Sequence, residues 1–220
     1  MTSSTTRFID LSHPIEDDMI TYPGLPGPQI TTHLSREDAE TSYGPGVTFH
    51  IGMVHICTNT GTYLDVPFHR FAGGHDLVDL ALDRVAQVPA VCLDHRGTRA
   101  IELDPGEVAS LAGCAVLIRT DHSEHFGTAR YAVDHPHLVA RSADLLVDAG
   151  VACVGIDSLN IDSTEDPRRP VHTTLLGAGI PIIEHLAGLS ELPTDGFTFT
   201  AVPPRLRGAG TFTVRAFATL

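Results

Sequence analysis

The sequence has 220 residues, 42% of them hydrophobic and 19% charged, which suits one globular domain with a sizeable core. Its formal net charge is −13, and all 14 basic residues are arginine. A chain this acidic argues against a nucleic-acid partner and against binding to an anionic membrane surface.

From the sequence we expect neither a membrane span nor a secretion signal. No run of about 18 apolar residues is present, and the first 15 residues lack a basic region followed by an apolar stretch. We therefore expect a cytoplasmic protein, disordered only in residues 1–6. The four cysteines form no C-x-x-C pair, so buried reduced thiols are expected at Cys57, Cys92, Cys114 and Cys153.

The first structural signal is a turn-rich segment at residues 22–28, which reads YPGLPGP. Fixed proline dihedrals and permissive glycines exclude a helix and a central strand there, so this segment is a shaped loop. A short strand is predicted further along, at residues 91–93. No repeat or linker divides the chain, and we predict a single domain over residues 1–220.

The clearest elements lie in the second half of the chain. Residues 115–119 and 151–156 are short apolar runs that suit buried strands. Between them a helix is predicted over residues 143–149, with Ser142 as its N-cap and Gly150 as its C-cap. Strand, helix and strand in this order indicate a parallel crossover and the α/β class. A further strand is predicted at residues 197–202 and a helix near residues 183–189.

Functional groups concentrate in residues 55–71, which read HICTNTGTYLDVPFHRF. In an extended chain Asn59, Tyr63, Asp65 and His69 would share one face, because successive side chains alternate. A half-exposed strand with its polar side in water is one interpretation of this pattern. The other is a platform for chemistry, because an amide, a phenol, a carboxylate and an imidazole are not a generic surface.

Residues 59–69 read N-T-G-T-Y-L-D-V-P-F-H, and five positions match the signature H-x-G-T-H-x-D-x-P-x-H. The chain thus resembles the cyclase or kynurenine formamidase-like family of metal-dependent hydrolases. Four other segments are similar to that family, namely residues 9–15, 155–162, 172–184 and 210–218. The resemblance covers nearly the whole chain. It implies an α/β fold of the swivelling β/β/α type, with mixed β-sheets and flanking helices in one compact domain, and a homodimer or higher homo-oligomer.

The resemblance also implies roles for individual residues. Asp65 falls on the aspartate that bridges two metal ions in the family, and His172 and Glu184 fall on later metal ligands. His69 falls on the histidine thought to shuttle protons. The two histidines of the first metal position fall on Asn59 and Tyr63, so this chain departs from the family there.

This departure leaves three possible compositions of the site, because amide and phenol oxygens suit Mn²⁺ or Mg²⁺ better than Zn²⁺. In the first, Asp65, His172 and Glu184 would hold one divalent ion, zinc or manganese, with an open position for water. Alternatively, a more oxygen-rich site uses Asn59 or Tyr63 as well. In the third case no metal binds, and the site works by acid–base chemistry.

The function we predict is hydrolysis of a small amide, formamide or cyclic amide or lactone. A metal ion would activate water, His69 would carry the proton, and Tyr63 would donate a hydrogen bond to the oxyanion. Tyr22 would line the pocket of this small-molecule substrate. One alternative is a non-hydrolytic cyclase or dehydratase of secondary metabolism, with Tyr63 and His69 as its acid and base. Another is a non-catalytic binding protein, although such a protein has no need to bury two carboxylates beside two histidines.

Other polar residues receive structural interpretations. A solvated loop is favoured over a second metal site for four histidines, His122, His125, His135 and His137. Asp157 and Asp162 are interpreted as groups that fix a loop or orient a ligand. His13 and His55 are expected to be structural.

Overall fold

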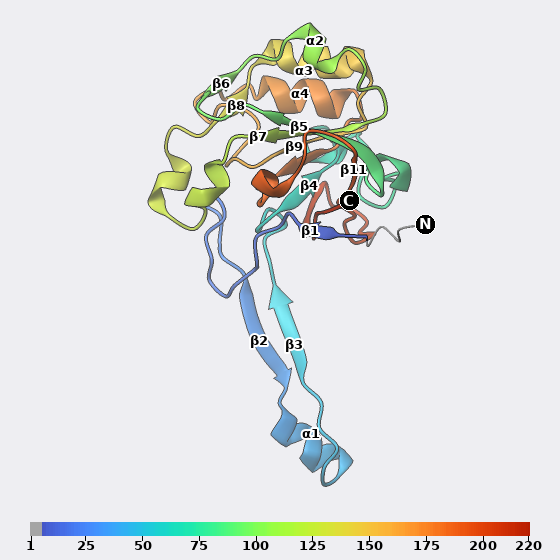
Figure 1. Cartoon of the computed structure of the whole chain (residues 1–220). Coiled ribbons are helices and arrows are strands. Elements are labelled where there is room, and N and C mark those ends of the chain that lie inside the picture. Colours follow the sequence, from blue (N-terminus) through green and yellow to red (C-terminus); the bar gives the residue numbers. More distant parts are fainter. Residues whose placement is uncertain (1–5) are drawn as a thin grey trace, which may run out of the picture.

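A curled, mixed sheet of nine strands forms the centre of the computed structural model, which describes residues 6–220 (Figure 1). Most of the disorder predicted at the N-terminus lies outside this range. In spatial order the strands are β1 (Phe8–Asp10), β13 (Phe217–Thr219), β11 (Phe197–Thr200), β5 (Val88–Asp94), β7 (Ala115–Arg119), β9 (Cys153–Ile156), β10 (Ile182–Glu184), β4 (Tyr63–Asp65) and β12 (Thr211–Thr213). A second small ribbon pairs β6 (Ala100–Ile101) with β8 (His137–Leu138).

The middle of the sheet is parallel and covered on both faces. Strands β5, β7, β9 and β10 run parallel, and the outer pairs are antiparallel. Helices α2 (Pro105–Val108), α3 (Ala140–Ala149) and α4 (Pro170–Gly177) form a layer over one face (Figure 1). Ile118 and Val154 pack toward that layer, whereas Leu117 and Cys153 belong to a second core on the other face. Burial on both faces explains why these strands read as continuous apolar runs.

The predicted crossover is confirmed. Strands β7 and β9 pair in parallel with α3 between them in the chain, and Gly150 ends α3 in the left-handed conformation with φ of 68°. The prediction that Ser142 caps the helix is wrong, because α3 begins at Ala140. The Ser142 hydroxyl instead donates to the carbonyl of Ile101 and accepts from the backbone of Leu103, so it joins the helix to a neighbouring strand.

Two other predictions are corrected. The helix predicted near residues 183–189 is absent, because Ile182–Glu184 is drawn into the sheet as β10 and His185 has φ of 56°, which a helix cannot contain. The interpretation of residues 55–71 as a half-exposed strand also fails, because β4 (Tyr63–Asp65) lies between β10 and β12 and is buried on both faces. After it Pro67 begins a 3₁₀ turn, η1 (Pro67–His69), so the alternation stops before His69.

Four further short 3₁₀ turns connect the strands. They are η2 (Leu82–Arg84), η3 (His122–His125), η4 (Ala129–Ala132) and η5 (Leu189–Glu191). Within residues 6–220 no helix is long and apolar enough to cross a membrane. All four cysteines are free; Cys92 and Cys153 are buried as predicted, whereas Cys57 and Cys114 are partly exposed.

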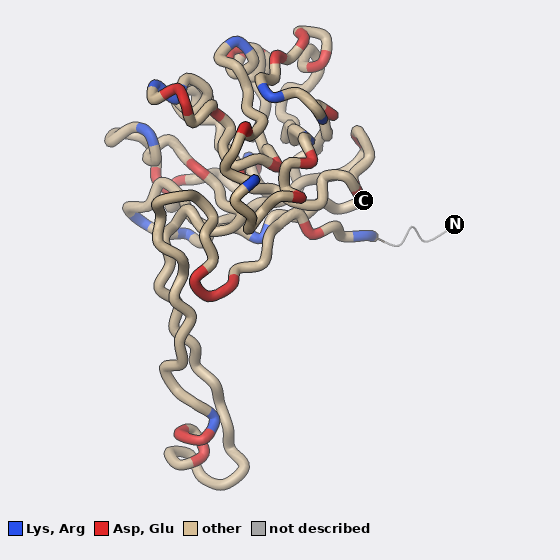
Figure 2. The backbone as a smooth tube through the Cα atoms, turned by 90° about the vertical axis from the view of Figure 1, so that its left-hand side faces the viewer, with Lys and Arg blue, Asp and Glu red and all other residues tan. Residues whose placement is uncertain are grey.

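A long arm, residues 29–55, projects from the body (Figure 1). Strands β2 (Gln29–Leu34) and β3 (Ile51–His55) pair in antiparallel fashion, and helix α1 (Arg36–Tyr43) lies at the tip. Figure 2 shows charged residues only at the tip and none along the two strands. The arm exposes seven large apolar side chains, which are Ile30, Tyr43, Val47, Phe49, Ile51, Met53 and Val54. A two-stranded ribbon is marginally stable alone in water, so this arm is suited to being covered.

Candidate functional site

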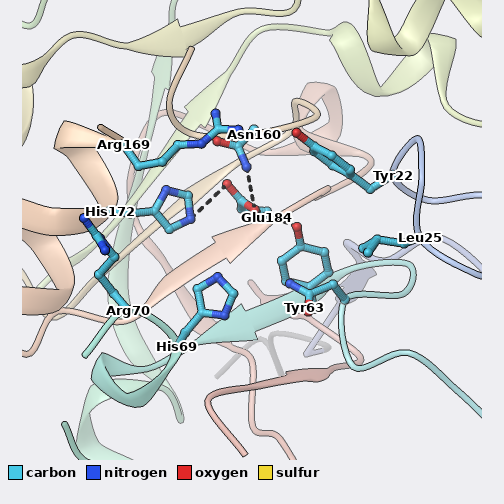
Figure 3. Close-up of a pocket in the computed structure, with 10 residues that line it drawn as sticks. Tyr22, Leu25, Tyr63, His69, Arg70, Asn160, Arg169, His172 and Glu184 are labelled. Atoms are coloured by element: carbon cyan, nitrogen blue, oxygen red, sulfur yellow. Dashed lines mark hydrogen bonds and ion pairs between the residues drawn. The ribbon is translucent and has the colours of Figure 1, made fainter. Parts of the chain in front are cut away.

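A pocket of about 240 Å³ opens where β4, β10, η1 and α4 meet (Figure 3). Its lining combines acidic, basic, amide and apolar side chains. These are Tyr22, Leu25, Asn59, Tyr63, His69, Arg70, Asn160, Arg169, His172 and Glu184. The seven residues that the sequence assigned to catalysis, metal binding or substrate binding therefore lie in or beside one pocket. Six of them line it, and the seventh, Asp65, lies two residues after Tyr63 on the same strand.

Strand pairing brings the central groups together. Glu184 on β10 is the registered partner of Tyr63 on β4, and Thr211 on β12 is the partner of Asp65. His172 reaches the same place from the first turn of α4. The side chains of Asp65, His172 and Glu184 are almost completely buried, so their charges are not screened by water.

Asp162 fixes the orientation of His172. One carboxylate oxygen accepts from the backbone of Val171, and the other accepts from the backbone and from Nδ1 of His172, the latter at 2.7 Å. Because Nδ1 is the donor to Asp162, Nε2 is the ring atom directed at Asp65 and Glu184. The expectation that Asp162 orients a ligand agrees with these contacts.

Thr211 links Asp65 to His69. Its hydroxyl makes a short hydrogen bond with Oδ1 of Asp65 and lies 2.8 Å from Nδ1 of His69. Since the hydroxyl proton goes to the carboxylate, its oxygen accepts from His69 Nδ1–H. This network assigns the tautomer of His69 and leaves its Nε2 free to accept a proton.

Two glycines enclose the turn that carries His69. A Cβ atom at Gly210 would overlap the backbone nitrogen of His69, and one at Gly74 would overlap the backbone of Pro67. The turn is therefore packed against main chain on both sides. Gly73, the neighbour of Gly74, makes no such contact, since a Cβ atom there would meet open space.

Glu184 accepts hydrogen bonds from several directions. The Tyr63 hydroxyl donates to Oε2 at 2.7 Å, and the backbone of Ile161 donates to Oε1 at 2.6 Å. Behind Tyr63, His185 Nε2 lies 3.2 Å from the hydroxyl, and the Tyr131 hydroxyl lies 2.9 Å from His185 Nδ1. Each hydrogen bond in this series is therefore donated toward Glu184: Tyr131 donates to His185, His185 donates to Tyr63, and Tyr63 donates to Glu184.

The electrostatics of the cluster are those of a cation site. Burial raises the pKa of Glu184 above its ordinary value despite the His172 ring, and Asp65 adds to that effect. Burial disfavours a charged His172, but the carboxylates of Glu184, Asp162 and Asp65 outweigh it and raise the pKa of His172 to about 10. Burial, Glu184 and Asp65 raise the pKa of Tyr63 well above its ordinary value, so this phenol stays protonated.

The donor set fits a divalent metal ion. Within the described residues Oδ2 of Asp65 is buried without a hydrogen-bond partner. His172 Nε2 lies 3.7 Å from that oxygen and 3.6 Å from Glu184 Oε1. These separations are too long for hydrogen bonds and close to the ~3.4 Å between ligands of a tetrahedral ion with bonds of ~2.1 Å. Asp65, His69 and His172 also offer ligand atoms within 4.8 Å of one another, so His69 is a further candidate ligand.

The comparison with protein families decides the relationship that the motif suggested. The Cyclase family model matches residues 9–163. The chain belongs to this family. Its fold is accordingly the one that the sequence resemblance implied, a single α/β domain with a large curled sheet.

Kynurenine formamidases are among the curated relatives of this chain. Those of Bacillus thuringiensis (strain Al Hakam) and Bacillus mycoides (strain KBAB4) are 28% and 29% identical to this chain over 213 residues, covering 96% of it and 97% of the relative. A solved structure described as a potential metal-dependent hydrolase with cyclase activity has a TM-score of 0.78 at 25% identity, covering 98% of both chains. Isatin hydrolase A from Ralstonia solanacearum has a TM-score of 0.81 at 23% identity, covering 98% of this chain and 92% of that one, and shares the fold.

Several residues of the site were not singled out by the sequence. Asn160 and Thr211 lie in segments that resemble the family but were given no role in the site, and His185 and Tyr131 carry no local motif. Arg70 and Arg169 were also missed, although Arg70 directly follows His69. Asn59 lines the pocket, but its side-chain oxygen accepts from the neighbouring Thr58 at 3.2 Å.

The solvated loop predicted for His122, His125, His135 and His137 is wrong, because none of these four side chains is fully exposed. His122 stacks on Tyr131 and contacts its carbonyl at 2.8 Å, while His135 and His137 are buried. Within the described part of the chain these rings form no cluster of three ligands with His125. His13 stacks on Phe126, which agrees with the structural role expected for it, and His55 lies exposed on the arm.

Burial of His135 predicts a dependence of stability on pH. Burial lowers its pKa to about 4 from about 6.5, so the unfolded chain takes up a proton first as the pH falls, and stability is lost from about pH 6.5 toward pH 4. The wild type should therefore lose more stability than His135→Gln when the pH is lowered from 7 to 5. We expect the two decreases in the free energy of unfolding to differ by about 1 kcal/mol. Urea titrations at the two pH values measure this difference, and equal falls in both proteins would contradict it.

Proposed function

We propose that the protein is a metal-dependent hydrolase of a small amide, formamide or cyclic amide or lactone, acting on C–N bonds in the amide case. The observation that carries the proposal is that His172 Nε2, Glu184 Oε1 and Asp65 Oδ2 converge in one pocket, where Oδ2 has no hydrogen-bond partner among residues 6–220. The names of the relatives, kynurenine formamidase and isatin hydrolase, support an amide substrate. A cytoplasmic location stays a prediction.

The ligands we propose are Asp65, His172 and Glu184, holding one divalent ion, zinc or manganese. Asn59 lies near enough to the pocket to add an oxygen ligand if its side chain turns away from Thr58. When bound, the ion would polarise a carbonyl and lower the pKa of water near it. Asp162 would keep the Nε2 lone pair of His172 directed at the ion.

His69 is the proton carrier in this proposal. Its ring lies in the pocket and is partly exposed, and Thr211 holds its Nδ1 proton, so Nε2 can accept a proton from water and pass it to the leaving nitrogen. The alternative is that His69 is itself a metal ligand, because its distances to Asp65 and His172 also permit that role.

The role we propose for Tyr63 differs from the oxyanion donor that the sequence analysis expected. Its single proton is donated to Glu184, so donation to an oxyanion requires the hydroxyl to turn away from that carboxylate. We propose that Tyr63 fixes Glu184 in the resting site. His185 and Tyr131 hold the phenol from behind.

Metal content and turnover, measured on the same sample, test the function. We expect about one ion per chain and hydrolysis of N-formylkynurenine, formanilide or isatin that a chelator abolishes and Zn²⁺ or Mn²⁺ restores. Absence of bound metal after supplementation would contradict the proposal. Hydrolysis that persists with a chelator would contradict the role of the metal, whereas a metal-free protein that hydrolyses none of these substrates would favour the second candidate, a cyclase or dehydratase using Tyr63 and His69. The second candidate is supported by Asn59 and Tyr63, because they replace two histidines that bind metal in the family signature.

We also propose that the arm covers a second copy of the chain in a homodimer. Its strands carry no charge and expose apolar side chains on both faces. A two-fold arrangement would bury both arms at once, because each copy contributes the same surface. Residues 29–55 match the 20 to 30 or so residues that one partner contributes to a stable interface.

Charges placed on the arm should therefore separate the copies. Ile51 and Met53 lie on one face of β3 and are about half exposed. We expect the double variant Ile51→Glu, Met53→Glu to be a monomer by light scattering, whereas the wild type is a dimer. Leu82→Glu is the control, because Leu82 is equally exposed but lies on the body. A monomeric wild type, or a double variant that remains dimeric, would refute the arm as the interface.

A further inference from the structure

Two arginines occupy one side of the pocket. Figure 3 shows Arg70 and Arg169 beside His172, and Tyr22 and Leu25 on the opposite side. Glu184 lies between the two sides. The pocket therefore has a cationic wall and an apolar wall, with the proposed reaction centre in the middle.

Both arginines are held in place by the fold. Arg169 has a left-handed backbone with φ of 50°, a strained conformation for a non-glycine residue, and its NH1 donates to the carbonyl of Ser163 at 2.8 Å. The Thr173 hydroxyl donates to the carbonyl of Arg169 at 2.8 Å and accepts from Nε of Arg70 at 3.1 Å. One hydroxyl thus ties the two arginines to the start of α4.

Neither guanidinium has a carboxylate partner among residues 6–220, although the chain has a large excess of acidic groups. Arg168, the neighbour of Arg169, behaves differently and forms a fork with Asp166 at 2.8 Å. Arginine presents a planar set of donors that matches a carboxylate. Two such groups without protein partners in a pocket indicate that the anion comes from the ligand.

A competing explanation is that the arginines offset the negative charge of Asp65 and Glu184. Among residues 6–220, however, neither guanidinium lies within 4 Å of the carboxylate of Asp65 or Glu184; the groups within that distance are the rings of His69 and His172. The guanidinium ends are then available to a ligand that enters the pocket.

We propose that Arg70 and Arg169 bind a carboxylate of the substrate, so the substrate class is a small anionic amide with an apolar part against Tyr22 and Leu25. This inference rests on the proposed hydrolase function for its substrate, but not for the binding of the anion. Arg70 and Arg169 are then specificity-determining residues that act through KM more than through kcat.

The kinetic test compares two formamides that differ only in a carboxylate, 2-formamidobenzoate and formanilide, on metal-loaded enzyme. We expect kcat/KM to favour the anionic substrate by at least about tenfold, and Arg70→Gln and Arg169→Gln each to reduce that ratio about tenfold, mainly through KM. Added salt should weaken the preference in the wild type. Arg168→Gln is the matched control, since its side chain is exposed and already paired, and its ratio should equal that of the wild type.

A binding measurement separates this inference from the proposed function. Calorimetry with 2-aminobenzoate and with aniline needs no turnover, and we expect only the acid to bind, with affinity lost in both pocket-arginine variants. If neither formamide is hydrolysed but this binding pattern holds, the hydrolase proposal fails and the anion site stands. If the wild type shows no preference for the acid, or both variants affect charged and neutral ligands equally, the anion site is overturned.

Discussion

Asp65→Asn is expected to abolish metal binding and to reduce hydrolysis at least about 10³-fold. The substitution keeps the size of the side chain but replaces the buried Oδ2 that has no hydrogen-bond partner in the described structure. The cluster also loses one of the charges that make it attractive to a cation. Elemental analysis of protein dialysed against excess metal measures the first effect, and turnover of formanilide measures the second.

Thermal unfolding gives a second readout for Asp65 that does not depend on activity. A ligand that binds only the folded state raises the unfolding midpoint, so added metal should stabilise the wild type and leave Asp65→Asn unchanged. Asp157→Asn is the control. Asp157 is a buried carboxylate outside the pocket that accepts from Thr120 and Asp121, and its loss should lower stability without preventing the response to metal. A normal metal content in Asp65→Asn would remove Asp65 from the ligand set.

His69→Asn is expected to lower kcat by about 10²- to 10⁴-fold with metal content and KM little changed. The reason is that the ring carries the proton in our proposal but does not hold the ion. Thr211→Val should lower kcat less, because it removes the acceptor that fixes the tautomer while leaving the ring in place.

Metal content distinguishes the two roles that the position of His69 allows. Loss of the ion in His69→Asn would mean that the cluster of Asp65, His69 and His172 is the ligand set and that another group carries the proton. His75→Asn is the matched control, since His75 is exposed on the loop that follows. Wild-type turnover in His69→Asn would refute the proton-transfer role directly.

The fold was predictable where local pattern and tertiary environment agree. Strands β7 and β9 are continuous apolar runs, and Gly150 ends the helix between them in the conformation that glycine favours. The pattern failed at residues 183–189, because the pairing of β10 with β9 on one side and with β4 on the other outweighs the local preference for helix. The arm was missed as well. In the sequence its apolar side chains resemble those of a core, and only the structure shows that no part of residues 6–220 covers them.

The site was predictable in part. Asp65, His69, His172 and Glu184 were identified through a motif and its resemblance to a family, and the structure brings them to one pocket. Of the groups that orient them, Asp162 was expected from the sequence, but the others could not be found in that way. Thr211 reaches Asp65 through strand register, and Tyr131 acts through His185, so neither has a fixed spacing from the motif.

The turn that carries His69 also bears on how the pocket could be altered by design. Gly210 and Gly74 place main chain on both sides of it, so its position depends little on the packing of neighbouring side chains. Libraries that vary Tyr22 and Leu25 should therefore yield new substrate ranges with the proton carrier still in register. A library that includes position 74 or 210 should be dominated by inactive members, because even an alanine there has no room.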